Sequence, residues 1–317
     1  MEILLQILLL VFGFILLIKG ADWFVEGASK IADRFHIPQI VIGLTIVAFG
    51  TSAPEAAVGI NAGIKGNAGI ALGNVLGSNV INILLILGIT ALIAPLAIKT
   101  TTLKYEVPFV ILISAVVLAS GKISGEISLI HGLILWGLFI VFFLYLIRLS
   151  KQGEAPLDDV PLAGKSDSLP KLIIMTLIGL AAIVIGSDFT VNSATKLATV
   201  FGLSERFIGL TIVAFGTSLP ELITSATAAT KKKTDIAIGN IIGSNIFNIL
   251  FVLGTTALIS PVAFEPSFVL DSIMCIASAV LLFLCVFKNK RLGRAGGAVM
   301  LITYIIYFAY LYTSTTA

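Results

Sequence analysis

Two carboxylates stand inside apolar segments of this 317-residue chain, each in nearly the same local sequence. Glu55 ends the stretch GLTIVAFGTSAPE, and Glu221 ends GLTIVAFGTSLPE, which differs at one of thirteen positions. A charge at bilayer depth costs at least about 2.5–3.5 kcal/mol, and neither segment offers a Lys or Arg near its Glu in sequence. Such a carboxylate needs a proton or a metal ion. Its repetition in the same context favours an ion site over a merely buried, protonated acid.

The neighbours of each glutamate supply further oxygen ligands. Pro54 and Pro220 have no N–H and clash with the preceding turn, so carbonyls of residues 49–52 and 215–218 lose intrahelical donors. At membrane depth such carbonyls are tolerated only where they line a cavity or meet an ion. Carboxylate, carbonyl and hydroxyl are the ligands of Ca²⁺, Mg²⁺ or Na⁺, and not of zinc or copper. The hydroxyls belong to Thr51, Ser52, Thr217 and Ser218.

A second repeated pair of stretches predicts a facing wall. GNVLGSNVINILLILG begins at Gly73 and GNIIGSNIFNILFVLG at Gly239, and their small-xxx-small spacing lets helices approach closely. In each stretch a Ser and an Asn lie four residues apart and share one helix face. These four are Ser78, Asn82, Ser244 and Asn248. The remaining asparagines favour hydrogen bonds between helices over metal ligation: Asn74, Asn79, Asn240 and Asn245.

The composition requires membrane helices to position these residues. The chain is 58% hydrophobic and 12% charged, against about 45–50% and about 25% in soluble domains. Apolar runs of 17 to 27 residues are each long enough to cross about 30 Å of hydrocarbon. The net charge of +3 gives no reason to expect nucleic acid as a partner. We predict an all-α polytopic membrane protein with ten transmembrane helices, at 3–25, 37–63, 68–94, 105–121, 127–148, 170–195, 205–230, 235–260, 267–287 and 295–313.

The two halves of the chain form an internal repeat with a constant offset of 166 residues. We predict a five-helix repeat at 1–148, a cytoplasmic linker at 149–169 and a second repeat at 170–317. Because five is odd, the second half enters the membrane from the opposite side, which makes an inverted-topology repeat as in many secondary transporters. With the N-terminus outside, Lys and Arg divide fifteen to the cytoplasm and four to the exterior. This predicts a multi-pass plasma-membrane protein with both termini extracytoplasmic.

The polar residues near the ends of the segments are interpreted structurally. Asp22 and Asp188 favour pairing with a neighbour or solvation at the membrane surface. The run Lys231–Lys233 is interpreted as a cytoplasmic anchor.

The two motif pairs resemble the sodium/calcium exchangers of the cation/calcium antiporter superfamily, in the prokaryotic form with two α-repeats. GTSAPE and GTSLPE, each followed about 20 residues later by GSN, form the combination that carries this resemblance. The resemblance implies eight core helices, with the first and sixth spans lying obliquely against them and sliding to expose the site alternately. It implies that Ca²⁺ and Na⁺ bind as transported substrates, that no separate cofactor is needed, and that the protein is not an enzyme.

Carried over position by position, the resemblance implies a role for each ligand. Glu55 and Glu221 would hold Ca²⁺ together with the carbonyls of Thr51 and Thr217. Two flanking Na⁺ sites would each use two hydroxyls and one carbonyl, and two amides would complete the middle. The first Na⁺ set is Ser52, Ser78 and Ala48; the second is Ser218, Ser244 and Ala214; the amides are Asn82 and Asn248.

One position departs from part of that family. K⁺-dependent members, and some prokaryotic ones, carry Asp where this chain has Asn248, which weakens the case for K⁺ co-transport. The linker is too short for the Ca²⁺-sensing insert of animal exchangers, and no protein partner is implied.

Alternatives to a Na⁺/Ca²⁺ antiporter with three Na⁺ per Ca²⁺ stay open. A H⁺/Ca²⁺ antiporter of the same superfamily would use the same carboxylates, and a passive cation channel would use similar ligands. An intramembrane enzyme is disfavoured because neither GTSAPE nor GTSLPE contains a His or Lys base to activate its Ser.

Overall fold

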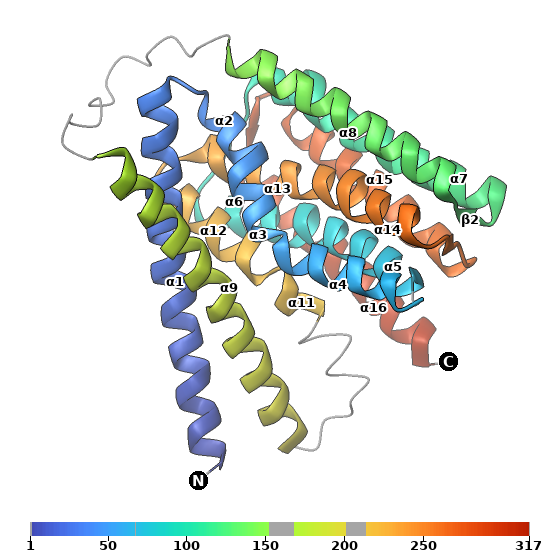
Figure 1. Cartoon of the computed structure of the whole chain (residues 1–317), viewed down its shortest axis with the longest axis horizontal. Coiled ribbons are helices and arrows are strands. Elements are labelled where there is room, and N and C mark those ends of the chain that lie inside the picture. The colour runs from blue at the N-terminus through green and yellow to red at the C-terminus, as the bar shows by residue number, and fades with distance from the viewer. Residues whose placement is uncertain (1, 67, 152–167, 201–213, 317) are drawn as a thin grey trace. The chain divides into compact units, whose positions relative to one another are not determined.

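The computed structural model describes residues 2–66, 68–151, 168–200 and 214–316, and these are almost entirely helical (Figure 1). Within them, eight helices are long and apolar enough to cross a membrane. The protein is therefore a predominantly helical, multi-pass membrane protein, as predicted. The eight are Ile3–Phe35, Gly69–Ile93, Thr102–Ser124, Leu129–Ser150, Leu169–Leu197, Thr234–Ile259, Ser267–Val286 and Arg294–Thr313.

Each of these eight helices coincides with one of the ten predicted spans. The second predicted span is broken, because Gln39–Thr51 and Ala53–Ile64 qualify only together, as the two pieces of a bent segment. The seventh, at 205–230, falls partly on residues 201–213, which lie outside the described part of the chain. The linker prediction likewise falls mainly on residues 152–167, also outside it. The count of ten therefore stays a prediction.

The first helix is longer than predicted. Helix α1 runs from Glu2 to Phe35, whereas the sequence placed its end at residue 25. The hydropathy signal stops there because Glu26 and Lys30 follow, but these two side chains form an ion pair of 2.9 Å one turn apart. Such i,i+4 pairs support a helix. The helix ends where His36 adopts a left-handed φ of 54° two residues before Pro38.

Two compact units make up the chain, and each draws on both sequence halves. The first unit contains Met1–Glu55 and Val141–Asn240, and the second contains Ala56–Ile140 and Ile241–Ala317. The first unit holds α1, α2 (Gln39–Ile42), the π-helical turn η1 (Gly43–Val47), α3 (Ala48–Thr51), α9 (Leu169–Val200), α11 (Ala214–Thr217) and α12 (Leu219–Thr230). Helices α4 (Ala53–Ile64), α8 (Leu129–Ser150) and α13 (Thr234–Phe247) cross the unit boundaries.

Helices α1 and α9 lie side by side in the first unit (Figure 1). Glycines let their backbones touch: a Cβ built on Gly20 would lie 2.8 Å from the carbonyl oxygen of Gly179, and one on Gly186 would lie 2.8 Å from that of Gly13. Small residues at such crossings are a usual way for membrane helices to associate, because close approach gains van der Waals contact. The two helices therefore pack as one tight pair.

The second unit contains the remaining elements. They are α5 (Ala68–Val80), η2 (Ile81–Ile86), α6 (Leu87–Ile93), η3 (Thr102–Glu106), α7 (Val107–Ser124), η5 (Asn248–Leu253), α14 (Gly254–Ile259), α15 (Ser267–Val286) and α16 (Arg294–Thr316). Helix α7 packs against α15, and α6 packs against α16.

Two short antiparallel ladders in the second unit tie the sequence halves together. Strand β1 (Leu96–Ala97) pairs with β4 (Arg291–Leu292), and β2 (Glu126–Ile127) pairs with β3 (Val262–Ala263). The repeat offset of 166 residues carries β1 onto β3 and brings β2 within one residue of β4. Each half thus contributes one strand to each ladder.

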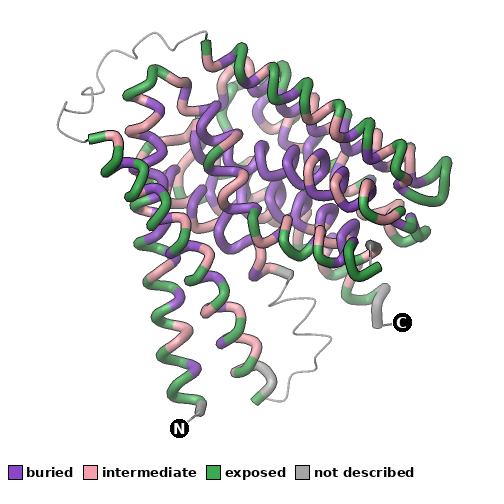
Figure 2. The backbone as a smooth tube through the Cα atoms, in the orientation of Figure 1, coloured by how far each residue is buried: buried purple, intermediate pink, exposed green. Residues whose placement is uncertain are grey.

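The helices differ in how far they are buried (Figure 2). In the most apolar window of Thr234–Ile259, 94% of residues are buried, against 22% for Leu129–Ser150. Large apolar side chains of α8 are exposed, including Ile130, Leu133 and Leu144. An apolar face of this size is suited to lipid rather than to water.

Candidate functional site: a buried carboxylate and hydroxyl cluster

The helical segments that carry the two predicted glutamates are interrupted at equivalent positions of the repeat, Ser52 and Ser218. Helix α3 ends at Thr51, Ser52 leaves the helical region at φ −84° and ψ 9°, and α4 begins at Ala53. In the second half, α11 ends at Thr217 and Ser218 adopts φ −91° and ψ 5° before α12 begins. The predicted interruption at Pro54 and Pro220 is thus confirmed, and its cause is the missing proline N–H.

The interruption places each serine on the glutamate of the other repeat. Ser52 Oγ donates a hydrogen bond of 2.8 Å to Glu221 Oε1, and Ser218 Oγ lies 3.4 Å from Glu55 Oε1. The four side chains are at most 1% exposed. Two buried carboxylates and two hydroxyls therefore alternate in one cluster of the first unit, which we call the carboxylate cluster. Its oxygens are hard donors, the kind that Na⁺ and Ca²⁺ prefer as ligands.

A polar chain extends the carboxylate cluster on one side. Thr51 Oγ1 donates to Asn240 Oδ1 at 2.9 Å, and the Asn240 amide donates to Ser225 Oγ at 2.9 Å and to the Glu221 carbonyl oxygen at 3.4 Å. Asn240 therefore bonds between helices, as predicted. Close packing supports it, since a Cβ on Gly239 would lie 2.9 Å from the Cα of Gly43. At Gly73, by contrast, the nearest described atom is a ring carbon of Phe268 at 3.6 Å, so close approach there stays a prediction.

At the second interruption, the Gly216 carbonyl accepts a hydrogen bond from a hydroxyl that has no counterpart in the first half of the chain. Pro220 has no N–H for the Gly216 carbonyl, and Ser187 Oγ on α9 donates to that oxygen at 3.0 Å. The equivalent residue of the first half is Ala21, which has no hydroxyl. Ser187 could not be predicted from the repeat, because the equivalent residue has no hydroxyl.

The predicted amide ligands lie in the second unit. Asn82 Nδ2 donates to Asn245 Oδ1 at 3.0 Å, and Asn248 Nδ2 donates to Asn79 Oδ1 at 3.2 Å. Asn79 and Asn245 bond across helices, as predicted. The π-helical turns η2 and η5 begin beside Asn82 and at Asn248. Such turns often occur at functional sites.

The other predicted ligands are placed as follows. Ser78 and Ser244 are buried on α5 and α13, in the second unit. The Ala48 carbonyl accepts the Ser52 N–H at 3.0 Å and the Thr51 hydroxyl at 3.4 Å. Thr217 and Ala214 are the two ends of α11. The grouping of all twelve residues in one site stays a prediction.

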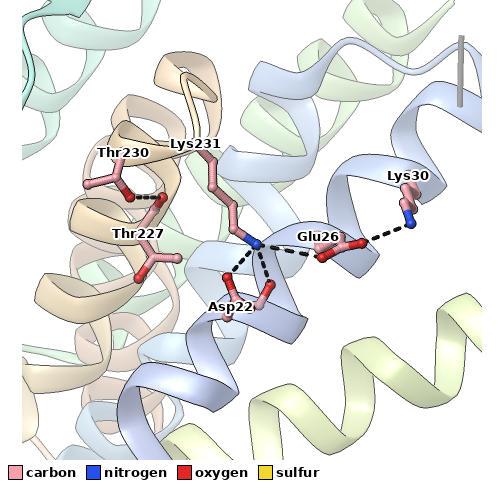
Figure 3. Close-up of polar contacts among 6 residues, drawn as sticks. All are labelled: Asp22, Glu26, Lys30, Thr227, Thr230 and Lys231. Atoms are coloured by element: carbon pink, nitrogen blue, oxygen red, sulfur yellow. Dashed lines mark hydrogen bonds and ion pairs between the residues drawn. The ribbon is translucent and has the colours of Figure 1, made fainter. Parts of the chain in front are cut away.

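An ionic cluster joins α1 to the end of α12 in the first unit (Figure 3). Lys231 Nζ lies 2.6 Å from Asp22 Oδ1 and 3.7 Å from Glu26 Oε2, and Glu26 pairs in turn with Lys30. The predicted structural pairing of Asp22 is confirmed, whereas that of Asp188 stays a prediction. Lys231 is thus a partner of α1, and its interpretation as part of a cytoplasmic anchor stays a prediction.

Comparison with known proteins identifies the family of this chain. Residues 5–148 and 171–313 match the family described as sodium/calcium exchanger protein. The chain belongs to the sodium/calcium exchanger family.

Relatives match over nearly the full chain. The inner membrane protein YrbG of Escherichia coli (strain K12) is 38% identical over 312 residues, which cover 96% of each chain. The sodium/calcium exchanger MaX1 of Methanosarcina acetivorans is 32% identical, covering 96% of this chain and 98% of its own. Among solved structures, the sodium-calcium exchanger NCX_Mj superimposes with a TM-score of 0.83 at 33% identity, covering 96% of this chain and 98% of that one.

Proposed function

We propose that this chain is a secondary active antiporter that exchanges Na⁺ for Ca²⁺ by alternating access. The observation that carries the proposal is the exchanged pairing of Ser52 with Glu221 and of Ser218 with Glu55. Two buried carboxylates can balance one dehydrated Ca²⁺, and the hydroxyls beside them suit Na⁺. The family membership and the printed names of MaX1 and NCX_Mj support the same choice of ions.

The proposed ligands are the twelve predicted from the sequence. Glu55 and Glu221 hold Ca²⁺ with the carbonyls of Thr51 and Thr217. One Na⁺ uses Ser52, Ser78 and the Ala48 carbonyl, and another uses Ser218, Ser244 and the Ala214 carbonyl. Asn82 and Asn248 contribute amide oxygens and no charge. The ions are substrates, and the proposed mechanism needs no cofactor and no enzymatic step.

The proposed architecture is ten spans in two inverted five-helix repeats, with both termini outside the cytoplasm. The two ladders, β1 with β4 and β2 with β3, support it because each pairs strands from opposite halves in an exchange consistent with a two-fold relation. The charge bias of fifteen basic residues against four supports the orientation.

Two alternatives predict different behaviour. A H⁺/Ca²⁺ antiporter would protonate Glu55 and Glu221 in place of binding Na⁺. A passive channel would carry Ca²⁺ down its own gradient without a counter-ion. The hydroxyls that bond both glutamates favour a site that also accepts Na⁺, because proton exchange needs only the carboxylates.

The test is ⁴⁵Ca²⁺ uptake into proteoliposomes driven in turn by outward Na⁺, K⁺ and H⁺ gradients. We expect uptake with the Na⁺ gradient alone and no requirement for K⁺, since Asn248 adds no charge to hold one. Uptake driven by the H⁺ gradient would support the first alternative, and uptake without any gradient would support a channel. The Glu55→Gln protein in the same vesicles measures the background leak.

A further inference from the structure

Asn79 and Asn245 form a reciprocal pair within the second unit, which we call the amide clasp. Asn79 Nδ2 donates to the Asn245 backbone carbonyl at 3.2 Å, and Asn245 Nδ2 donates to the Asn79 carbonyl at 3.3 Å. The two residues are repeat equivalents, 166 positions apart, and both are at most 2% exposed. Each bond therefore has its mirror, and the clasp fixes which end of each amide carries the nitrogen.

The clasp in turn fixes the amides of the predicted ligands. Because their nitrogens face backbone carbonyls, the planar amides of Asn79 and Asn245 place their Oδ1 atoms on the opposite side. Those oxygens accept hydrogen bonds from Asn248 Nδ2 at 3.2 Å and from Asn82 Nδ2 at 3.0 Å. Because the Asn82 and Asn248 nitrogens make these bonds, the oxygens of the same planar amides point in the opposite direction.

The oxygens turned away have no hydrogen-bond partner. Asn82 Oδ1 and Asn248 Oδ1 are both buried, and neither meets a donor among the described residues. A buried acceptor without a donor costs about 1–3 kcal/mol, so native proteins keep few of them. Asn82 Oδ1 and Asn248 Oδ1 occupy equivalent positions of the repeat, and the amide clasp orients both. A cation would satisfy this pair of acceptors.

We propose that Asn79 and Asn245 are positioning residues that keep the carbonyl oxygens of Asn82 and Asn248 free to accept a cation and that dictate an amide, not a carboxylate, at both positions. The inference rests on the proposed function. A carboxylate at position 248 would set an oxygen against Asn79 Oδ1, where a donor now stands at 3.2 Å. Asn79 cannot turn its nitrogen to meet it without releasing the Asn245 carbonyl.

The first test removes the clasp with a side chain of similar shape. Asn79→Leu and Asn245→Leu should raise the half-saturating Ca²⁺ of Na⁺-driven uptake about tenfold, which corresponds to about 1.4 kcal/mol of binding free energy. The rise in Tm that Ca²⁺ produces in the purified protein should shrink in parallel. A merely structural role would lower the Tm without Ca²⁺ and leave the Ca²⁺-induced rise unchanged, which would overturn the inference.

Thr90→Val is the matched control. Thr90 is buried in α6, and its hydroxyl donates to the Ile86 carbonyl of its own chain segment at 2.7 Å. This variant removes a buried hydrogen bond of the same unit but touches neither clasp nor ligand. Its half-saturating Ca²⁺ should match the wild type. If Ca²⁺ does not raise the Tm of the wild type, the proposed function is overturned. If Ca²⁺ raises the Tm of the wild type and of both Leu variants equally, this inference alone is overturned.

The second test asks whether the clasp dictates the amide. Asn248→Asp should bind Ca²⁺ at least about tenfold more weakly, since the new carboxylate oxygen faces Asn79 Oδ1. Adding Asn79→Ser should restore part of that loss, because a hydroxyl can donate to the carboxylate. Such rescue is a coupling that independent sites do not show. An Asn248→Asp protein that binds Ca²⁺ as the wild type does, or a double variant whose losses simply add, would contradict the inference.

Discussion

Ser52 lies three residues from Glu55 in the chain but donates its hydrogen bond, at 2.8 Å, to Glu221 from the other half. Ser218 approaches Glu55 in the same exchanged sense at 3.4 Å. Each carboxylate is therefore held by the repeat to which it does not belong. Two negative groups confined in one buried cluster would repel each other, so a cation bound between them would stabilise the arrangement.

The glutamates are predicted to be essential for transport and dispensable for folding. Glu55→Gln or Glu221→Gln should reduce Na⁺-driven ⁴⁵Ca²⁺ uptake to the background of empty vesicles, because an amide cannot balance a dehydrated divalent ion. Gel filtration of the purified variants should still give the wild-type elution profile. Vigorous Ca²⁺ exchange by the double Gln variant would show that the ion binds elsewhere.

The serines are predicted to act on Na⁺ more than on Ca²⁺. Ser52→Ala and Ser218→Ala should each raise the half-saturating Na⁺ several-fold and change the half-saturating Ca²⁺ less. Ser52→Ala should have the larger effect, since its hydrogen bond is 2.8 Å and that of Ser218 is 3.4 Å. Kinetics of Na⁺-dependent Ca²⁺ uptake measure both constants. Equal losses for the two ions would assign the hydroxyls to general packing.

The ionic cluster of α1 and α12 is predicted to contribute little to stability at high salt. The Lys231 and Asp22 side chains are 30% and 41% exposed, and such pairs contribute at most about 1 kcal/mol. Asp22→Asn should lower Tm slightly in low salt and by less near 1 M salt, because salt weakens the attraction between exposed charges. Lys233→Met, from the same lysine run, is the control. A loss that is equally large in low and high salt would assign Asp22 a role beyond the ion pair.

The topology is tested by cysteine labelling in intact cells, on a background in which Cys275 and Cys285 are replaced by Ala. A cysteine at Lys232 or Lys290 should react only after a reagent enters the cytoplasm, and one at Lys122 should react from outside. The physical reason is the odd number of predicted spans between equivalent loops of the two repeats. Reaction of all three positions from the same side would rule out the inverted repeat.

The sequence predicted the local features of the site and not its partners. The glutamates, the interruptions at Pro54 and Pro220, and the bonding role of Asn79 all follow from residue type and apolar context. The partner of each group does not, because it lies far away in the chain: Lys231 is 209 residues from Asp22, and Asn79 is 166 from Asn245.

The end of α1 was predicted too early for a related reason. Polar residues in an apolar run look like a membrane boundary, yet Glu26 and Lys30 satisfy each other within the helix and Lys231 adds a third charge. A hydropathy pattern records the cost of each charge but not the pairing that offsets it. The bond from Ser187 to the Gly216 carbonyl was missed because the other half has Ala21 at that position.

The charge carried per cycle is the most direct test of Na⁺ coupling. Glu55 and Glu221 contribute two negative charges, so the site sums to zero with one Ca²⁺ and to +1 with three Na⁺. Na⁺ exchange therefore moves one net charge, which over the full membrane is worth about 2.3 kcal/mol per 100 mV. The measurement is ⁴⁵Ca²⁺ uptake into Na⁺-loaded vesicles with the potential clamped by K⁺ and valinomycin at several values. We predict that uptake rises as the interior becomes more positive; uptake that ignores the potential and follows a pH gradient would contradict the account.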